Sequence, residues 1–112
     1  MTWTELQVFL KGKVFLIGFT FVDKNGKTIE KFQTSGTVTE LLDDAVIVFL
    51  RSDKSVFQVP FESETIVKAS AGDYEESETG RKIVNPDFRV NWKITIEDPA
   101  QMEKIKKNGY FI

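Results

Sequence analysis

An almost unbroken apolar run over residues 14–22, VFLIGFTFV, constrains the fold more than any other segment of this chain. Large apolar side chains recur at every second position of the run, at Phe15, Ile17, Phe19 and Phe21. This period of two, with aromatic and β-branched residues, is typical of a strand with one buried face. Asn25-Gly26 follows the run, and both residues tolerate the positive φ of a tight turn. The sequence therefore predicts a hairpin that turns here.

Further strands are predicted after this turn, each bounded by turn-forming residues. They span about residues 27–42, 45–50, 55–59, 65–69 and 88–96. Gly36 lies in the middle of the longest segment, where a glycine indicates a bulge or a sharp bend. Pro60 ends or edges another strand, because proline cannot donate to a strand ladder. Residues 71–79 form a polar, acidic loop, and Ile83-Val84 is a candidate for a brief pairing.

Both ends of the chain carry helix signals. Thr2 and Glu5 fit a capping box before an apolar pattern with helical spacing, although a strand over residues 6–10 is an alternative. At the other end, Asp98 fits the N-cap and Pro99 the first helical position, and Gly109 ends the helix. The sequence therefore predicts a C-terminal helix over about residues 98–108.

The order of these elements predicts the fold class. The chain, residues 1–112, is expected to be one domain, mainly β, with a core over about residues 13–96. Several short strands, one of them long and bent, with helices only at the ends, favour a small antiparallel barrel. A helix before a bent second strand, and a short closing strand after a proline, are similar to SH3-like or Sm-like barrels. That similarity concerns the fold alone.

The chain contains no His and no Cys among its 112 residues. It therefore lacks the commonest general base, the thiol nucleophile and the soft metal ligands. No phosphate-binding glycine loop and no serine–lysine motif is present. We accordingly expect no catalytic residue, no cofactor and no metal, and we do not expect an enzyme.

Charge and hydropathy bear on the surroundings of the chain. The net charge is −2, which does not favour nucleic acid or an anionic membrane as a partner. No apolar run approaches the roughly 18 residues of a membrane-spanning helix. Glu5 before the first apolar run, with Lys11 and Lys13 after it, is the wrong charge order for a signal peptide. We therefore expect a cytoplasmic protein.

An acidic cluster in the polar loop is the one candidate for a binding site. It consists of Asp73, Glu75, Glu76 and Glu78. A solvated loop explains such a cluster, and a surface for a hard cation or for a basic protein is the alternative. The spacing matches no known ligand pattern, so protein binding is the more useful form of that alternative.

Aromatic side chains offer two further interpretations. Phe15, Phe19, Phe21 and Trp92 are suited to stacking on bases, or they belong to the core. Their uninterrupted apolar context, without interleaved Lys or Arg, favours the core. Trp3 and the terminal Tyr110-Phe111-Ile112 are expected to pack onto the body of the protein. Otherwise they form an exposed patch for a partner or for self-association.

A distinctive set of residues spreads over roughly residues 15–96. Its most specific part is the tail, Thr79-Gly80, Val84-Asn85-Pro86-Asp87-Phe88, Trp92 and Ile94. Its other members are Gly18, Thr20, Phe21, Asp23, Gly26, Phe32, Gln33, Gly36, Val38, Phe57, Pro60 and Tyr74. Together they resemble a family of small, uncharacterised bacterial proteins, which has a double proline where this chain has Val59-Pro60-Phe61. The resemblance implies a bacterial source and a stand-alone barrel, and it implies no catalytic residue.

Three classes of function follow from these observations. The first is a non-enzymatic module that binds another, basic protein, for instance an immunity-type protein that covers a toxin's active site with the acidic loop. The second is an Sm-like oligomeric RNA-binding protein, which the charge balance does not favour. The third is an enzyme that works through carboxylates, which requires a pocket in which they converge.

Overall fold

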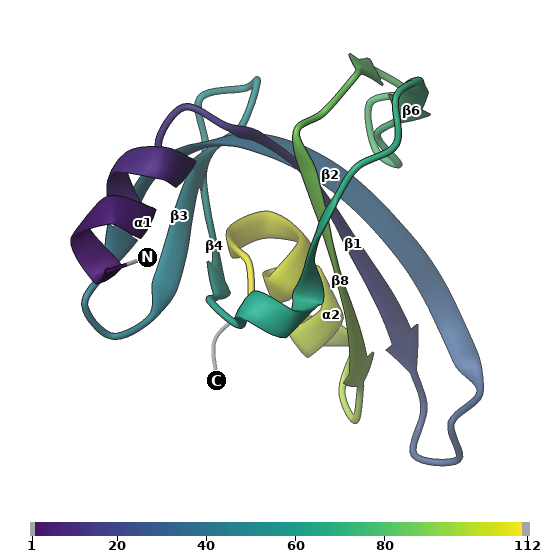
Figure 1. Cartoon of the computed structure of the whole chain (residues 1–112). Helices are drawn as coiled ribbons and strands as arrows, with labels where there is room; N and C mark the ends of the chain where they lie inside the picture. The colour runs from purple at the N-terminus through teal and green to yellow at the C-terminus, as the bar shows by residue number, and fades with distance from the viewer. Residues whose placement is uncertain (1, 111–112) are drawn as a thin grey trace.

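The predicted hairpin lies at the centre of the fold in this computed structural model, which describes residues 2–110 (Figure 1). β1 (Val14–Val22) pairs antiparallel with β2 (Thr28–Leu42) along its whole length. In the turn, Asp23 accepts hydrogen bonds from the backbone N–H groups of Asn25 and Lys27 through Oδ1, each at 2.9 Å. Gly26 has a φ of 83°, whereas Asn25 does not adopt a positive φ. The predicted turn is therefore confirmed, and the aspartate side chain closes it.

Four further strands join β1 and β2 in one mixed sheet of six strands, in the order β4-β3-β2-β1-β8-β5. Their bounds are β3 (Val46–Leu50), β4 (Val56–Pro60), β5 (Ile66–Lys68) and β8 (Phe88–Thr95). A 3-10 helix, η1 (Ser63–Thr65), precedes β5. A separate hairpin joins β6 (Asp73–Glu75) to β7 (Lys82–Val84). The prediction of a mainly β chain with short strands is confirmed.

The arrangement of β8 differs from the predicted antiparallel barrel. β8 runs parallel to β1 and lies between β1 and β5. The chain returns to the beginning of β1 just before β8 starts. There Val14 N–H donates to Asp87 Oδ2 at 2.8 Å, and Asp87 N–H donates to the Val14 carbonyl at 2.9 Å. β8 therefore leaves this point in the same direction as β1. Over the described residues, β4 and β5 remain at opposite edges, so the sheet does not close.

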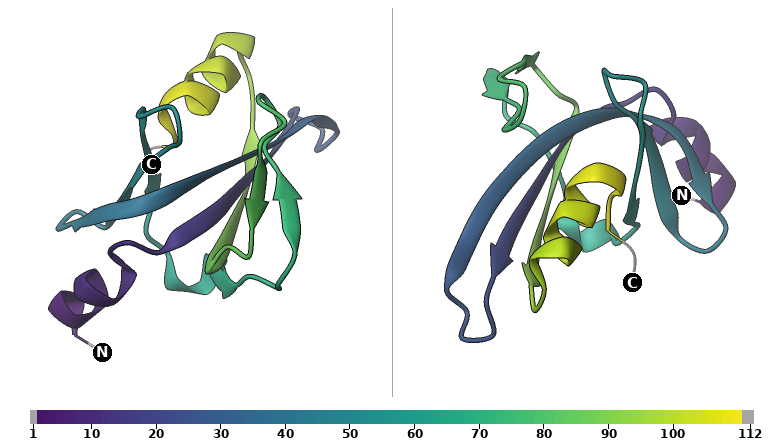
Figure 2. Two further views of the ribbon diagram at one scale, coloured as in Figure 1. Left: turned by 90° about the horizontal axis from the view of Figure 1, so that it is seen from above. Right: turned by 180° about the vertical axis from the view of Figure 1, so that it is seen from behind.

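Both predicted helices are present, and the alternative of a strand over residues 6–10 is wrong. α1 (Trp3–Leu10) begins with the complete capping box of Thr2 and Glu5. α2 (Pro99–Asn108) begins after Asp98, whose side chain accepts from the N–H of Ala100, and ends at Gly109. Figures 1 and 2 show α2 inside the curve of the sheet, where Ile105 belongs to the buried core.

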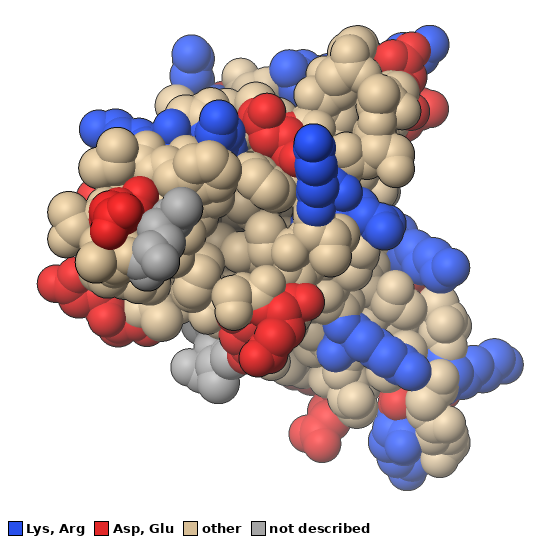
Figure 3. Space-filling view, in the orientation of Figure 1, with Lys and Arg blue, Asp and Glu red and all other residues tan. Residues whose placement is uncertain are grey.

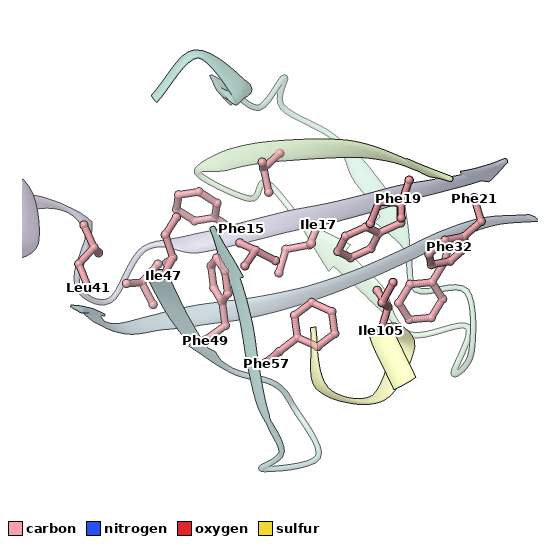
Figure 4. Packing of buried hydrophobic residues seen from close by; sticks show 14 of the residues in the cluster. Phe15, Ile17, Phe19, Phe21, Phe32, Leu41, Ile47, Phe49, Phe57 and Ile105 are labelled. Carbon is pink, nitrogen blue, oxygen red and sulfur yellow. The ribbon is translucent and has the colours of Figure 1, made fainter. Parts of the chain in front are cut away.

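The core lies between α2 and the concave face of the sheet (Figure 4). The side chains of Phe15, Phe19 and Phe21 are buried, and Trp92 packs partly buried against it. The interpretation of these aromatic residues as core is therefore confirmed. Gly36 lets the bent β2 approach β3, since a Cβ there would lie 2.7 Å from the Cβ of Phe49.

The predicted bulge of β2 and the packing of the chain ends are also visible. The pairing of β2 with β3 shifts register between Val38 and Glu40, a little beyond Gly36. The ring of Trp3 lies edge-on to that of Phe61, with centroids 5.5 Å apart. Tyr110 lies against Trp92, whereas Phe111 and Ile112 are outside the described residues. Trp3 and Tyr110 thus pack onto the body, as expected.

The C-terminal end of α2 is fixed to the sheet by three kinds of contact. The Arg51 guanidinium donates to the carbonyls of Lys106 at 3.1 Å and of Lys107 at 2.8 Å. The Nζ of Lys106 lies 2.6 Å from Glu30 Oε2. Gly109 then bridges to Gln58 on β4, and Tyr110 N–H donates to the Gln58 carbonyl at 2.9 Å. The contacts of Gly109 and Tyr110 cover the outer edge of β4 at Gln58.

We expect Gly109→Ala to reduce the free energy of unfolding by at least about 3 kcal/mol. Gly109 has a φ of 105°, and an added Cβ would collide with the backbone of Gln58. Gly26→Ala is the matched control, because its φ is 83° and its Cβ would meet nothing within 4 Å. The control should lose only about 1 kcal/mol. Urea denaturation measures both losses, and equal losses would contradict the role of the Gly109–Gln58 contact.

The ion pair of Lys106 predicts a pH-dependent stability. The hydrogen bond to Glu30 raises the Lys106 pKa above its ordinary value of 10.5. A raised pKa means that the stabilisation is complete below the unfolded-state pKa and is lost as pH rises through the folded-state pKa. We therefore expect Lys106→Met to cost about 1 kcal/mol at neutral pH and less as the pH rises above 10.5 and through the raised pKa of Lys106. The exposed Lys104→Met, measured by urea denaturation over the same pH range, should show no such change.

Candidate functional site

The acidic cluster lies on the β6–β7 hairpin, which stands apart from the main sheet (Figures 1 and 2). Part of the predicted loop is therefore a strand, and the predicted brief pairing of Ile83-Val84 is present in β7. The base of the hairpin is closed because Asn85 N–H donates to the Gly72 carbonyl at 2.9 Å, while Gly72 N–H donates to Asn85 Oδ1 at 2.8 Å.

The four carboxylates of the cluster do not share one environment. Asp73, Glu75 and Glu78 are exposed, whereas Glu76 is only 6% exposed. Asp73 and Glu75 are two positions apart on β6 and so lie on the same face of the hairpin. The structure thus divides the predicted site into three accessible carboxylates and one buried carboxylate. Glu76 is not accessible to a partner.

Glu76 joins the hairpin to β2 through hydroxyl groups. Its Oε2 accepts from Ser35 Oγ at 3.1 Å and from Thr34 Oγ1 at 3.5 Å. Its Oε1 accepts from Thr79 Oγ1 at 3.1 Å and lies 3.7 Å from Arg81 Nη1. A buried carboxylate is stable only when such partners replace its hydration. The hydroxyls and Arg81 supply these partners, so this contact fixes the position of the hairpin.

Backbone and amide contacts add a second attachment, at Gln33 of β2. Ser77 N–H donates to the Gln33 carbonyl at 2.9 Å, and Gln33 N–H donates to Ser77 Oγ at 2.7 Å. Gln33 Nε2 also donates to the Glu75 carbonyl at 2.9 Å. β3 pairs with β2 only from Thr37 onward, which leaves the earlier edge of β2 without a neighbouring strand there. The hairpin covers this edge at Gln33, as natural proteins commonly do with sheet edges.

The charges of the hairpin partly offset one another. Lys82 lies directly opposite Glu75 in the register of β6 and β7. Arg81 is next to the buried Glu76. With Arg81 paired to Glu76, Lys82 is the cation of the hairpin that is left to offset the exposed carboxylates. These are three, from Asp73, Glu75 and Glu78. The accessible surface of the hairpin is thus acidic, but less so than the sequence cluster suggests.

A small cavity of about 40 Å³ lies between the hairpin and the turn that joins β3 to β4. Arg51, Asp53, Glu76 and Glu78 line it with neighbouring hydroxyl groups. Hydrogen bonds from Ser55 lower the pKa of Asp53, which therefore stays ionised. A cavity of this size has room for only a few water molecules. It does not accommodate an organic substrate, and residues 2–110 bring no three acidic side chains together as a metal site.

The polar residues that fix the hairpin could not be identified from the sequence. Gln33, Ser35 and Thr34 lie in the middle of a predicted strand, where polar side chains usually mark the solvent face. Ser77 and Thr79 lie in a loop, where hydroxyls are common. The resemblance to the bacterial family included Gln33 and Thr79, but it assigned no role to either residue.

The chain matches no protein-family model, no curated protein and no solved structure. The resemblance to a family of uncharacterised bacterial proteins therefore stays a prediction. Between residues 2 and 110, no helix has the length and apolar character to cross a membrane.

We expect Glu76→Ala to destabilise the attachment of the hairpin by about 2 kcal/mol, since it leaves Ser35 and Thr79 without their acceptor. Glu78→Ala, which removes an exposed carboxylate two residues away, should change the stability by less than about 0.5 kcal/mol. Hydrogen exchange at the amides of Gln33 and Ser77 checks this directly. Both amides should exchange faster in Glu76→Ala alone, and unchanged exchange would show that the carboxylate does not hold the hairpin.

Proposed function

We propose that this chain is a non-enzymatic module that binds a basic protein partner through the β6–β7 hairpin. One observation carries the proposal. The hairpin projects from the sheet, is fixed to it by the buried Glu76, and leaves Asp73, Glu75 and Glu78 exposed. Glu76, the fourth carboxylate of the cluster, thus holds in place the hairpin that carries the other three.

The attachment reduces the entropic cost of binding. A free loop loses conformational entropy when a partner orders it, and that loss lowers the affinity. The contacts of Gln33 with Ser77 and Glu75 hold the backbone of the hairpin before any partner binds. Exposed carboxylates at the rim of an interface mainly accelerate association and make it depend on salt. The proposed partner therefore carries a basic surface.

An immunity-type role is the specific form of this proposal. A small acidic protein without catalytic groups inhibits a toxin by covering a basic active site. The hairpin is the segment that would enter such a site, and we propose that this takes place in the cytoplasm. The accessible excess of negative charge on the hairpin supports this role.

We further infer that the sheet is an SH3-like barrel opened by one inserted strand. The first five strands, with a 3-10 helix before β5, follow the expected order, but β8 lies where β5 would close against β1. The contact of Tyr110 with Gln58 occupies part of the outer edge of β4. An oligomeric ring that pairs such edges is therefore less well supported than a module that binds a partner by its hairpin.

The test is charge reversal on the hairpin. A triple variant, Asp73→Lys, Glu75→Lys and Glu78→Lys, should lose a basic partner that the unmodified protein captures from a lysate of the source cells. Repulsion replaces attraction, so retention should fall at least about tenfold at low salt. The unmodified protein should itself release the partner as salt increases.

A matched control reverses three exposed acids elsewhere on the surface, Asp44→Lys, Glu62→Lys and Glu64→Lys. This control carries the same change of net charge and should retain the partner. Equal retention by the two triple variants would exclude the hairpin as the contact surface. Circular dichroism of both variants verifies that each is folded.

A further inference from the structure

The outer face of the central strands forms a shallow trough with small residues in its floor. Gly18 and Thr20 of β1 make the floor. On the side of β2, Gln33 pairs with Gly18 and Lys31 pairs with Thr20. On the side of β8, Asn91 and Lys93 occupy the same two positions. Directly paired residues lie on the same face of a sheet, so these side chains stand in two short rows across β1.

The dimensions of the trough follow from the strand spacing. Neighbouring strands are about 4.8 Å apart, so the side chains of β2 and β8 rise about 10 Å from each other. A Cβ at Gly18 would collide with Oδ1 of Asn91, which shows that this amide lies over the glycine. A cavity of about 330 Å³ lies over the part of the trough nearest β2, where Gly18, Thr20, Lys31, Gln33, Ser77 and Asn91 are among its lining residues. Lys93 is not one of them, and it is placed beside Thr20 by the pairing of β1 with β8. The attached hairpin forms the wall of the cavity at Ser77.

The charge of the trough is positive although the protein carries a net charge of −2. Lys31 and Lys93 are exposed on either side of Thr20, and neither forms an ion pair with any residue of the described range 2–110. Arg89, two positions before Asn91 on the same face of β8, extends this positive surface. Figure 3 shows Lys and Arg side chains gathered over the side of the molecule where β8, β1 and β2 lie.

One carboxylate, that of Glu75, belongs to a residue that lines the cavity, and it faces elsewhere. Its Oε1 lies 3.5 Å from the Cβ position of Gly80, in the turn of the hairpin. Its backbone carbonyl contacts the trough, where it accepts from Gln33 Nε2 at 2.9 Å. Lys82 also lies opposite Glu75 in the hairpin. Glu75 therefore does not neutralise Lys31 and Lys93.

We propose that this trough binds a phosphate group. A tetrahedral anion over Thr20 can accept from the ammonium groups of Lys31 and Lys93 on opposite sides and from the Thr20 hydroxyl beneath it. The Asn91 amide supplies a further donor. Lysine binds phosphate as a point charge, and hydrogen bonds to charged groups are about twice as strong as neutral ones. The absence of a side chain at Gly18 gives the Asn91 amide room to lie over β1, beside the position of the phosphate.

The outer face of the trough presents Gly18, Thr20, Lys31, Gln33, Asn91 and Lys93, none of which is aromatic. Phe19 and Phe32 also border the cavity, but their side chains are buried in the core. A base therefore has no stacking platform there, and the phosphate carries the recognition. Two sources supply such a group, a small phosphate ester and the backbone of a single-stranded nucleic acid. This site is separate from the acidic surface of the hairpin and does not depend on the proposed protein partner.

The experiment is a titration of the ¹⁵N-labelled full chain with sodium phosphate, compared with sodium chloride at equal ionic strength. The amides of Gly18 and Thr20 should shift saturably with phosphate and not with chloride. Lys31→Gln and Lys93→Gln should each weaken binding about fivefold. Lys24→Gln, an exposed lysine of the β1–β2 turn, is the matched control and should bind as the unmodified protein does.

A variant with little effect on charge tests the floor of the trough. Gly18→Ala places a Cβ against the end of the exposed Asn91 side chain, which is free to move, so the fold should persist while phosphate affinity falls. A nucleoside monophosphate and a short oligonucleotide then distinguish the two sources. Tighter binding of the oligonucleotide, with Arg89→Gln weakening it alone, identifies a nucleic-acid backbone, and equal binding identifies a small ester. Shifts that do not saturate, or that persist in both lysine variants, would overturn the proposal.

Discussion

The pairing of β1 with a neighbour on each side is the interaction on which the rest of the structure depends. β2 pairs antiparallel along the whole of β1, and β8 pairs parallel along nearly all of it. Asp87 binds both backbone groups of Val14 at one end, and Ile96 N–H donates to the Val22 carbonyl at the other. These bonds fix the position of β8 and deliver α2 to the concave face. The aromatic row of β1, including the fully buried Phe15 and Phe21, is covered there.

The position of β8 between β1 and β5 explains why the sheet stays open. A strand between β1 and β5 widens the sheet, and α2 fills the enclosed side with Ile105. Arg51 connects the end of α2 to the turn after β3, and Lys106 connects it to β2. Gly109 then brings the chain against β4. The apolar surface that a closed barrel would seal by strand pairing is thus sealed by a helix.

Both proposed binding surfaces depend on the first part of β2, before Thr37, where β2 does not pair with β3. There Gln33 binds the hairpin through its backbone and its amide, and the same residue forms a wall of the trough. The hairpin carries exposed carboxylates, whereas the trough beside it carries Lys31 and Lys93. The protein therefore presents opposite charges on adjacent surfaces, a separation that a net charge of −2 conceals. With neighbouring surfaces of opposite charge, one small fold can attract a basic protein to one surface and an anion to the other.

The sequence by itself determined what depends on neighbours along the chain. The large apolar side chains at every second position from Phe15, the Asp23 turn and the caps at Thr2 and Asp98 are local features. Most of the strands and both helices were therefore predictable, whereas β6 lies in a predicted loop. The acidic residues of the hairpin were predictable as a group for the same reason. Only the tertiary structure decided that β8 runs parallel to β1, that Glu76 is buried, and that Lys31 and Lys93 pair with Thr20 from opposite sides. Each of these depends on contacts between residues more than ten positions apart, which strand pairing sets and which no local pattern of side chains specifies.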